Sequence, residues 1–151
     1  MGTHYKGARR EVRALDAQIK LERATNALRS RLEARLKPTG LAMRQLGVLE
    51  ALLHLGPLQQ HELGAKLLVS RANVTLIVDE LARRGLVRRE REVDDRRCNR
   101  VHLTAAGREK IGRIFPGHVA AIVEALAVLG ADEQEQLARL CRKLGRALAA
   151  L

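Results

Sequence analysis

Aromatic residues are almost absent from this chain of 151 residues. It contains one Tyr, one Phe and no Trp, whereas Leu and Ala are abundant. This composition favours helices, because β-sheets are enriched in aromatic and β-branched side chains. The shortage of aromatic side chains also argues against a pocket that stacks on a large planar ligand.

Cysteine and long apolar runs are scarce as well. Two cysteines, Cys98 and Cys141, are too few for a disulfide framework and lack the spacing of a metal site. The first 15 residues lack the apolar run of a signal peptide, and no window is apolar enough to span a membrane. We therefore expect a cytoplasmic protein, about one domain in size, that does not enter a membrane.

Positive charge is what the chain has in excess. The formal net charge is +11 and the isoelectric point is near 10.9, which suggests a polyanionic partner without naming it. The charge is +6 over residues 1–37, zero over 38–70, +3 over 71–100 and +2 over 101–151. Most of the excess therefore lies in residues 1–37, and residues 71–100 are only modestly basic.

Apolar residues at helical spacing predict a mainly α protein. The predicted helices cover residues 9–36, 43–55, 59–67, 70–84 and 104–129, and a last one starts within 130–133. Ser70 and Thr104 are good N-caps for the helices that follow them. The segment Phe115-Pro116-Gly117 predicts a kink or a break in the fifth helix.

A β-hairpin is predicted directly after the helix over 70–84. Val87-Arg88-Arg89 and Val101-His102-Leu103 read as short strands around the charged turn at 94–97. An arginine-tipped hairpin next to a helix with polar outward positions indicates a winged helix-turn-helix. The helix would enter the major groove, and the hairpin tip would reach phosphates or the minor groove.

The outward face of the helix over 70–84 is the predicted reading surface. Its other face carries the apolar stripe Val74, Ile77, Val78 and Leu81. Asn73 can pair with adenine, and Ala72 and Leu76 can pack against thymine methyl groups. The predicted DNA-binding residues on and before this helix are Gln59, Gln60, Ser70, Arg71, Ala72, Asn73, Thr75 and Leu76.

The hairpin contributes a second set of predicted DNA contacts. Arg96 or Arg97 would enter the minor groove, while Asp94 and Asp95 accept backbone N–H bonds in the turn and hold a neighbouring arginine. The predicted set in the wing is Arg88, Arg89, Arg91, Asp95, Arg96, Arg97 and Arg100. Surface salt bridges explain one or two of these arginines, but not all six.

Both terminal helices carry apolar faces that must be covered. The stripe of the last helix consists of Leu137, Leu140, Cys141, Leu144, Leu148 and Leu151. Because the small central core cannot cover both helices, we predict a homodimer. Residues 1–37 and 105–151 would form the helical dimerisation region, and residues 38–104 the winged helix-turn-helix. A monomeric bundle is the alternative.

Two stretches resemble the MarR family of winged-helix transcription regulators: PLQQHELGAKLLVSRANVTLIVDELARRGLVRRE and DDRRCNRVHLTAAG. The spacing Asp95-x-Arg97-x-x-x-Val101-x-Leu103-Thr104 matches the family's wing signature. The flanks GVLEALLHLG and EQEQLARLCRKLG extend the resemblance over nearly the whole chain. The resemblance implies an obligate dimer with interleaved terminal helices. It also implies binding to a palindromic operator, usually as a repressor, and often release by a small phenolic, anionic or oxidising effector.

The chain departs from the family pattern at three positions. Leu76 stands where Arg is frequent, Leu68 where Gly is frequent and Ala42 where a capping Thr is frequent, so a base or phosphate contact at position 76 is in question. The segments 114–118 and 66–68 resemble a branch that includes quinone-responsive repressors. The covalent sensors of that branch use an N-terminal cysteine, which this chain lacks.

The resemblance also implies an effector pocket between the dimer helices and the winged domain. Arg44, His54, His61 and His118 are its candidate polar anchors, although each residue type is more often a surface or structural residue. No cofactor is expected.

Other functions stay open on the residues alone. Cys98 lies beside Arg96, Arg97 and Arg100, and neighbouring cations lower a thiol pKa, so a thiol-based redox-sensing repressor is the main alternative. Five histidines without paired spacing give little support to a metal sensor. No Ser/His/Asp set, phosphate loop or carboxylate pair suggests an enzyme. A winged helix that binds only other proteins is a further possibility.

Overall fold

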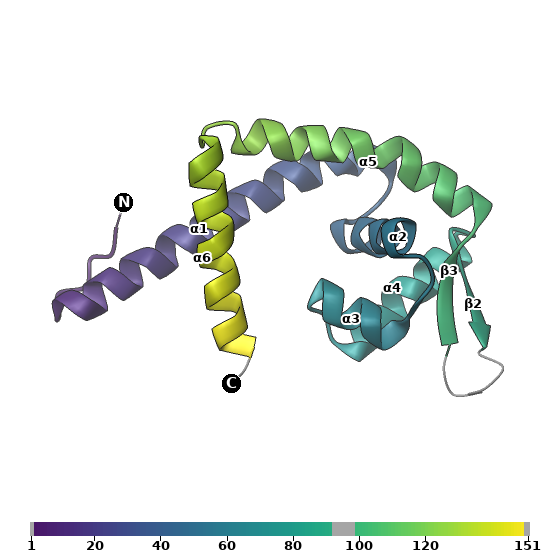
Figure 1. Cartoon of the computed structure of the whole chain (residues 1–151), viewed down its shortest axis with the longest axis horizontal. Helices are drawn as coiled ribbons and strands as arrows, with labels where there is room; N and C mark the ends of the chain where they lie inside the picture. Colours follow the sequence, from purple (N-terminus) through teal and green to yellow (C-terminus); the bar gives the residue numbers. More distant parts are fainter. Residues whose placement is uncertain (1, 92–98, 150–151) are drawn as a thin grey trace. The chain divides into compact units, whose positions relative to one another are not determined.

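The computed structural model describes residues 2–91 and 99–149. Within them the chain forms two compact units, Met1–His118 and Val119–Leu151. In chain order (Figure 1) the elements are α1 (Arg9–Leu36), η1 (Lys37–Thr39), α2 (Met43–Leu55), β1 (Leu58–Gln59), α3 (Gln60–Leu67), α4 (Arg71–Arg83), β2 (Val87–Arg91), β3 (Asn99–Leu103), α5 (Ala105–Leu126) and α6 (Ala131–Ala149). The mainly α fold with a small wing is confirmed.

The sheet of the first unit has three antiparallel strands in the order β1-β3-β2. The predicted hairpin is present, with Val87 opposite Leu103 and Arg89 opposite Val101. The third strand, β1, pairs Leu58 with Val101 and is only two residues long. Sequence patterning did not predict it, because two residues are too short to show alternation.

The core of the first unit lies where α2, α3 and α4 meet the sheet. Its fully buried side chains are Leu49, Leu52, Leu63, Leu81, Ile111, Val48, Val74, Val78 and Val101. The predicted stripe of α4 is confirmed, since Val74, Val78 and Leu81 are buried and Ile77 packs against them. This packing fixes which face of α4 points away from the core.

The turn after α4 joins the reading helix to the wing and to α5. Gly85 has a φ of 68°, and the amide of Leu86 donates to the carbonyl of Leu81 at 2.9 Å, which completes a Schellman-type helix end. Thr104 donates its hydroxyl to the Gly85 carbonyl at 2.6 Å and accepts from the Gly107 amide at 3.0 Å. Thr104 is therefore the predicted cap and also a link between two elements.

Of the kink or break predicted at Phe115-Pro116-Gly117, the break is wrong, because α5 runs through Pro116 without interruption. Proline removes one helical hydrogen-bond donor, and its ring comes close to the carbonyl four residues earlier. That residue is Gly112. The hydrogen bonds of the flanking turns hold a helix of 22 residues together despite this loss. α5 ends at Leu126, three residues before the expected position 129.

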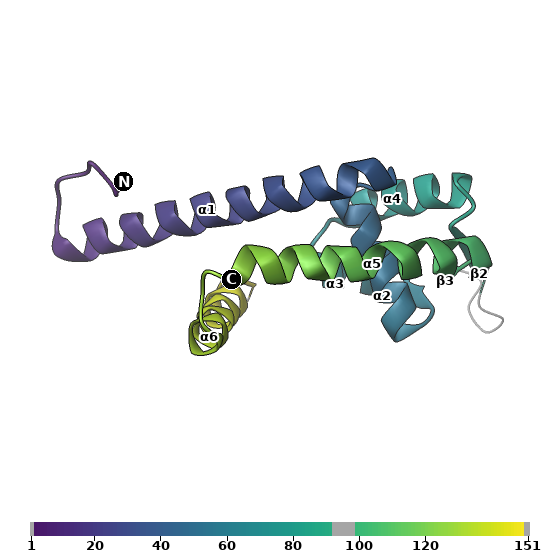
Figure 2. The same ribbon diagram turned by 90° about the horizontal axis from the view of Figure 1, so that it is seen from above.

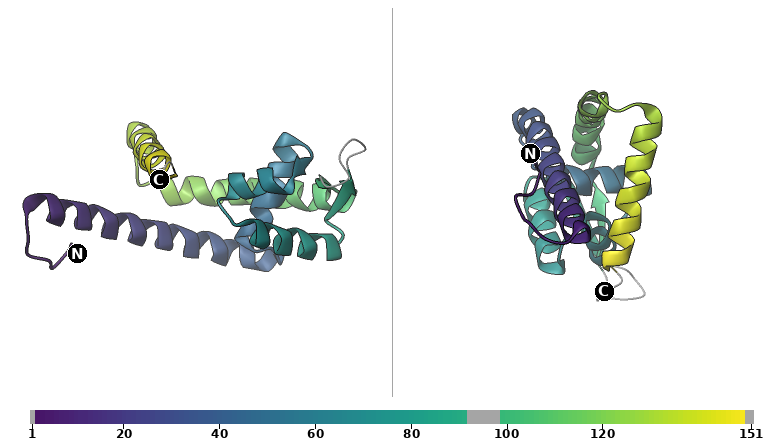
Figure 3. Two further views of the ribbon diagram at one scale, coloured as in Figure 1. Left: turned by 90° about the horizontal axis from the view of Figure 1, so that it is seen from below. Right: turned by 90° about the vertical axis from the view of Figure 1, so that its left-hand side faces the viewer.

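The N-terminal part of α1 projects from the rest of the first unit. Only Leu32 and Leu36 of this helix are buried, and Figures 2 and 3 show no other element of the unit beside its N-terminal half. In the second unit, every described side chain of α6 is exposed. Within the described residues no single helix has the length and apolarity to cross a membrane, and α5 and α6 pass that test only together, as a sharply bent pair.

Candidate nucleic-acid interface

The first turn of α4 presents the predicted reading residues to solvent. The hydroxyl of Ser70 accepts a hydrogen bond from the Asn73 amide at 3.3 Å, which satisfies one of the free N–H groups at the helix start. The side chains of Arg71, Ala72 and Asn73 are exposed. Ser70 therefore acts as the predicted cap and leaves its neighbours available for contact.

Leu76 is the apolar residue of this exposed face. Leu76 is 66% exposed, so its side chain is available for an apolar contact. It lines a cleft together with Met43 and Arg44 at the start of α2. The structure thus places Arg44, a predicted effector anchor, beside the reading helix.

Three of the residues predicted to contact DNA are hydrogen-bonded to one another. Gln60 of α3 donates its side-chain amide to the Thr75 hydroxyl at 3.0 Å and accepts from Arg89 Nε of β2 at 2.9 Å. Thr75 also donates to the Arg71 carbonyl at 3.1 Å. The side chains of Gln60, Thr75 and Arg89 are therefore engaged within the protein.

Asp79 completes this set of contacts and was not among the predicted site residues. Its carboxylate Oδ1 lies 2.7 Å from Nη2 of Arg89. The Arg89 side chain is only 27% exposed, whereas that of Asp79 is 48% exposed. The sequence offered one sign of this contact: Asp79 is an acidic residue on the outward face of a helix that is expected to meet DNA, so it needs a positively charged partner.

The other face of the sheet carries a second charged cluster. Glu90 forms an ion pair with Arg88, and its Oε2 lies 3.1 Å from Nε2 of His102 on β3. Burial lowers the pKa of His102, and the charges of Arg88 and Arg100 lower it further. Arg100 donates to the carbonyl of Pro57 at 3.3 Å, which ties β3 to the start of β1.

The remaining predicted DNA contacts are placed as follows. The backbone amide of Gln59 donates to Glu62 at 2.7 Å, at the start of α3, and Arg91 ends β2. The residues Asp95, Arg96, Arg97 and Cys98 lie outside the described residues. The predictions made for them stay predictions.

His118 lines a cleft of about 330 Å³ in the first unit. The other lining residues are Arg35, Leu36, Thr39, Arg113, Ile114 and Gly117. Burial lowers the pKa of His118, and the charge of Glu50 opposes this shift. Arg35 and Arg113 bring positive charge to this cleft, whereas the lowered pKa of His118 favours its neutral imidazole.

His54 lies nearby but does not line that cleft. Its Nδ1 is 3.0 Å from the Glu50 carbonyl oxygen, and its ring centroid lies 5.2 Å from that of Phe115. The Phe115 ring is in turn 6.4 Å from that of His118. His61 is exposed on α3.

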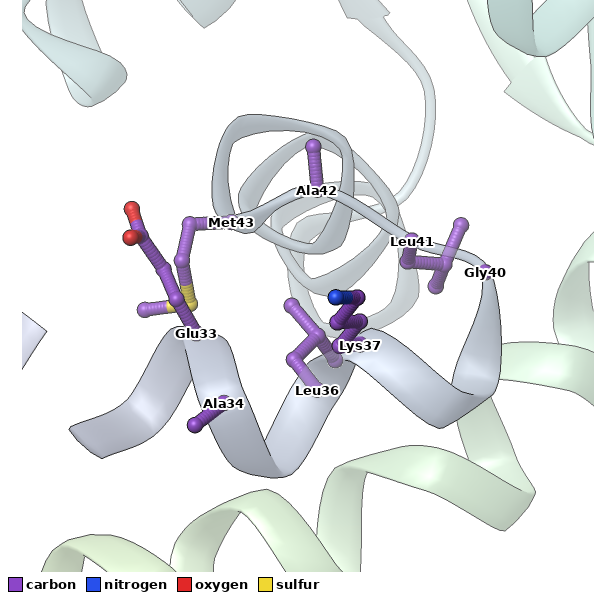
Figure 4. A pocket seen from close by; sticks show the side chains of 8 residues that line it. All are labelled: Glu33, Ala34, Leu36, Lys37, Gly40, Leu41, Ala42 and Met43. Carbon is purple, nitrogen blue, oxygen red and sulfur yellow. The ribbon is translucent and has the colours of Figure 1, made fainter. Parts of the chain in front are cut away.

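A third cleft, of about 450 Å³, lies between the end of α1 and the start of α2. Figure 4 shows the Glu33 carboxylate and the Met43 thioether on the same side of it. Leu36 and Leu41 supply much of its apolar lining. Over residues 2–91 and 99–149 no group of three or more His, Cys, Asp or Glu is placed to hold a metal ion.

Comparison with known proteins assigns the family. Residues 41–99 match the model of the MarR family. The chain is 38% identical to the uncharacterized HTH-type transcriptional regulator YkoM of Bacillus subtilis, over 72% of this chain and 71% of the relative. It is 36% identical to the transcriptional repressor MprA of Escherichia coli, over 58% of this chain and 49% of that protein.

Solved structures agree with this assignment. The MarR family transcriptional regulator Sco3205 of Streptomyces coelicolor, in complex with DNA, superposes with a TM-score of 0.85. It is 25% identical, and the match covers 97% of this chain and 93% of the other. The fold and the exposed face of α4 define a winged helix-turn-helix protein that binds DNA. The chain belongs to the MarR family of transcriptional regulators.

Proposed function

We propose that this chain is a dimeric repressor that binds a palindromic operator and is released by a small-molecule effector. The observation that carries the proposal is the first turn of α4, where Arg71, Ala72 and Asn73 are exposed beside the cap Ser70. The name of MprA, a transcriptional repressor, supports repression. The DNA complex of Sco3205 supports duplex DNA as the ligand.

In the proposed complex some residues contact the DNA bases and others contact the DNA phosphates. Asn73 pairs with an adenine, and Ala72 and Leu76 pack against thymine methyl groups. Arg71 and the arginines of the wing other than Arg89 contact phosphates, which sets affinity and salt dependence rather than specificity. Because Leu76 is apolar, the base pair under it should carry a thymine methyl.

The proposed dimer uses the helices at the two ends of the chain. In α6 the leucines Leu137, Leu140, Leu144 and Leu148 are between 42% and 61% exposed. An apolar face of that length is stable in water only when another surface covers it. A second copy of the chain covers it symmetrically and gives the two-fold symmetry that a palindromic operator requires.

The proposed effector is a small anion held in the cleft beside His118. Arg35 and Arg113 supply positive charge there, and their guanidinium groups fit a carboxylate or phenolate. Arg113→Gln should leave operator affinity intact and make release insensitive to such ligands. If small carboxylates or phenolates release the variant from the operator as readily as the wild type, the effector does not bind in this cleft.

A thiol-based redox sensor is the second candidate. It depends on Cys98, which lies among Arg96, Arg97 and Arg100 in the sequence, where cations favour the thiolate. If Cys98→Ser retains full sensitivity of DNA binding to peroxide or quinone, this candidate is excluded.

The test of the main proposal is a salt-dependent binding titration. The probe is a duplex of the DNA that flanks this protein's own gene, and the control is a scrambled duplex of the same composition. We expect a specificity ratio of about a thousand or more, with one dimer bound per palindrome. Equal affinity for both duplexes would contradict operator recognition at that site.

A further inference from the structure

We propose that Arg89 is a positioning residue that holds the wing strand β2 against the recognition helix α4, rather than a contact to DNA phosphate. The inference rests on the proposed operator recognition. It assigns sequence reading in part to an ion pair, Arg89–Asp79, that need not touch DNA. It also names Asp79 and Gln60 as the groups through which Arg89 acts.

The geometry connects three elements through one guanidinium. Nη2 of Arg89 lies 2.7 Å from Oδ1 of Asp79 on α4, and Nε donates to Oε1 of Gln60 on α3 at 2.9 Å. Gln60 then donates to Thr75 on α4 at 3.0 Å. Arg89 therefore contacts α4 directly through Asp79 and a second time through Gln60. Two separated contacts fix both the distance and the angle between strand and helix.

The neighbouring residues of β2 give this strand two distinct faces. Successive side chains of a strand point to opposite sides. Arg88 is exposed and pairs with Glu90, whereas Arg89 is opposite the buried Val101 and only 27% exposed. Arg89 therefore lies on the side of the strand that faces the helices.

The negative charge of Asp79 would oppose DNA binding if the carboxylate were not paired with a cation. An acidic side chain on the outward face of a DNA-reading helix repels phosphates. Its pairing with Arg89 cancels the two charges locally, so neither contributes much to attraction of the duplex. The Arg89–Asp79 pair can instead fix the position of β2 relative to α4. β2 leads into residues 92–98 of the predicted wing.

The same contacts engage the hydroxyl of Thr75 in hydrogen bonds within the protein. Thr75 accepts from Gln60 and donates to the Arg71 carbonyl, so its hydrogen-bonding groups are used. Base reading then falls to the exposed residues around it. The pair at Arg89 and Asp79 aligns those residues with the wing.

The test is an Asp79→Asn variant, because the two assignments predict opposite signs. Removal of a negative charge near DNA ordinarily strengthens binding. If Arg89 is a positioning residue, the loss of its partner instead weakens specific binding by about tenfold, while the affinity for scrambled DNA stays equal or rises. The probe is the tightest-binding duplex that the wild-type protein selects from a random-sequence pool.

Glu80→Gln is the matched control. Glu80 is the next residue on α4, its side chain is also 48% exposed, and it pairs with Arg83 of the same helix at 3.6 Å. This change removes the same charge without touching β2. We expect specific affinity to stay unchanged or to increase slightly.

Arg89→Gln separates positioning from phosphate contact. A lost phosphate contact lowers the slope of log affinity against log salt by about 0.9. A lost positioning contact lowers specific affinity about tenfold with the slope unchanged. The double variant Asp79→Asn/Arg89→Gln should be no weaker than either single variant, because both remove one pair.

The outcomes separate this inference from the proposed function. If the wild-type protein selects no duplex, operator recognition fails and so does the positioning role. If it selects one but Asp79→Asn binds it as tightly as Glu80→Gln does, only the positioning role is overturned. A reduced salt slope in Arg89→Gln, or additive losses in the double variant, would also overturn it. Thermal unfolding of each variant verifies that the measured protein is folded.

Discussion

Leu68 adopts a backbone conformation that suits glycine better than leucine. It ends α3 in the left-handed region with a φ of 52°, where a Cβ atom costs about 1–2 kcal/mol. Its side chain is 90% exposed, so few contacts offset this strain. The frequent glycine of the family at this place thus has a physical reason, and this chain departs from it at a cost in stability.

Leu68→Gly should therefore raise the free energy of unfolding by about 1 kcal/mol. The gain stays at the low end because glycine also increases the freedom of the unfolded chain. Denaturant titration of the wild type and the variant measures it. Leu68→Ala, which keeps the Cβ atom, should bring no comparable gain, and a glycine variant of unchanged or lower stability would contradict this account.

His118 makes the stability of the protein depend on pH. Burial holds its pKa below the ordinary value of 6.5 despite the opposing charge of Glu50. The unfolded chain therefore binds a proton more readily than the folded chain does, so stability is full above about pH 6.5 and falls as the pH decreases. His102, whose pKa is also lowered, contributes in the same direction.

His118→Gln should reduce this loss of stability on acidification. The measurement is the denaturant midpoint at about pH 7.5 and 5.5 for the wild type and the variant, with the difference smaller in the variant. If the denaturant midpoint of the wild type rises on acidification, the pKa of His118 is not lowered in the folded protein. An identical difference in both proteins would show that His118 does not contribute.

At the scale of elements, the helices were predictable and the smallest strand was not. The bounds of α1 and α2 match the predicted ranges, because apolar spacing and the flanking Pro and Gly residues mark the ends of a helix locally. β1 has only two residues and exists because β3 offers it a partner. Pro116 suggested a kink or a break, yet α5 continues through it despite one missing hydrogen bond.

The sequence was sufficient to predict which face of α4 points outward, but not which side chains on that face contact each other. The stripe that ends at Leu81 determined which side of α4 points outward, and the cap at Ser70 determined where the helix begins. Which outward side chains bind each other depends on how closely β2 approaches α4. Arg89 and Asp79 are ten residues apart on two elements, and no local pattern encodes their 2.7 Å contact.

The junction between the wing and α5 depends on Gly107. A Cβ atom there would lie 1.9 Å from the carbonyl oxygen of Leu86, a backbone atom that cannot move without shifting the turn after α4. Gly107→Ala should destabilise the protein by about 3 kcal/mol, at the upper end for overpacking. Thermal or denaturant unfolding measures the change.

Gly112→Ala is the matched control on the same helix. A Cβ atom at Gly112 would meet nothing within 4 Å, and alanine is a better helix former by about 1 kcal/mol. This variant should be as stable as the wild type or more stable. Equal effects of the two substitutions would show that the close approach at Gly107 is not real.

At the scale of the whole molecule, the exposed leucines of α6 support the proposed dimer. Leu140 is 52% exposed and Leu144 is 46% exposed. Leu140→Asp with Leu144→Asp should convert the proposed dimer to a monomer and abolish tight operator binding, because each half-site alone binds weakly. Sedimentation or light scattering gives the mass.

Arg139→Asp is the control for this prediction, because position 139 lies on the opposite side of α6 by helical periodicity. It adds a negative charge without placing it on the leucine face, so the mass should stay that of a dimer. A double variant that is still dimeric would place the interface elsewhere.

The most direct test of operator reading by the exposed face of α4 is a base-pair scan of the selected duplex. Affinity is measured for every single base-pair substitution with the wild-type protein and with Asn73→Ala. Asn73→Ala should lose discrimination at one base pair in each half-site, at symmetry-related positions, and keep it elsewhere. An equal loss of affinity on all sequences, with discrimination intact at every position, would contradict the claim that this face reads the operator.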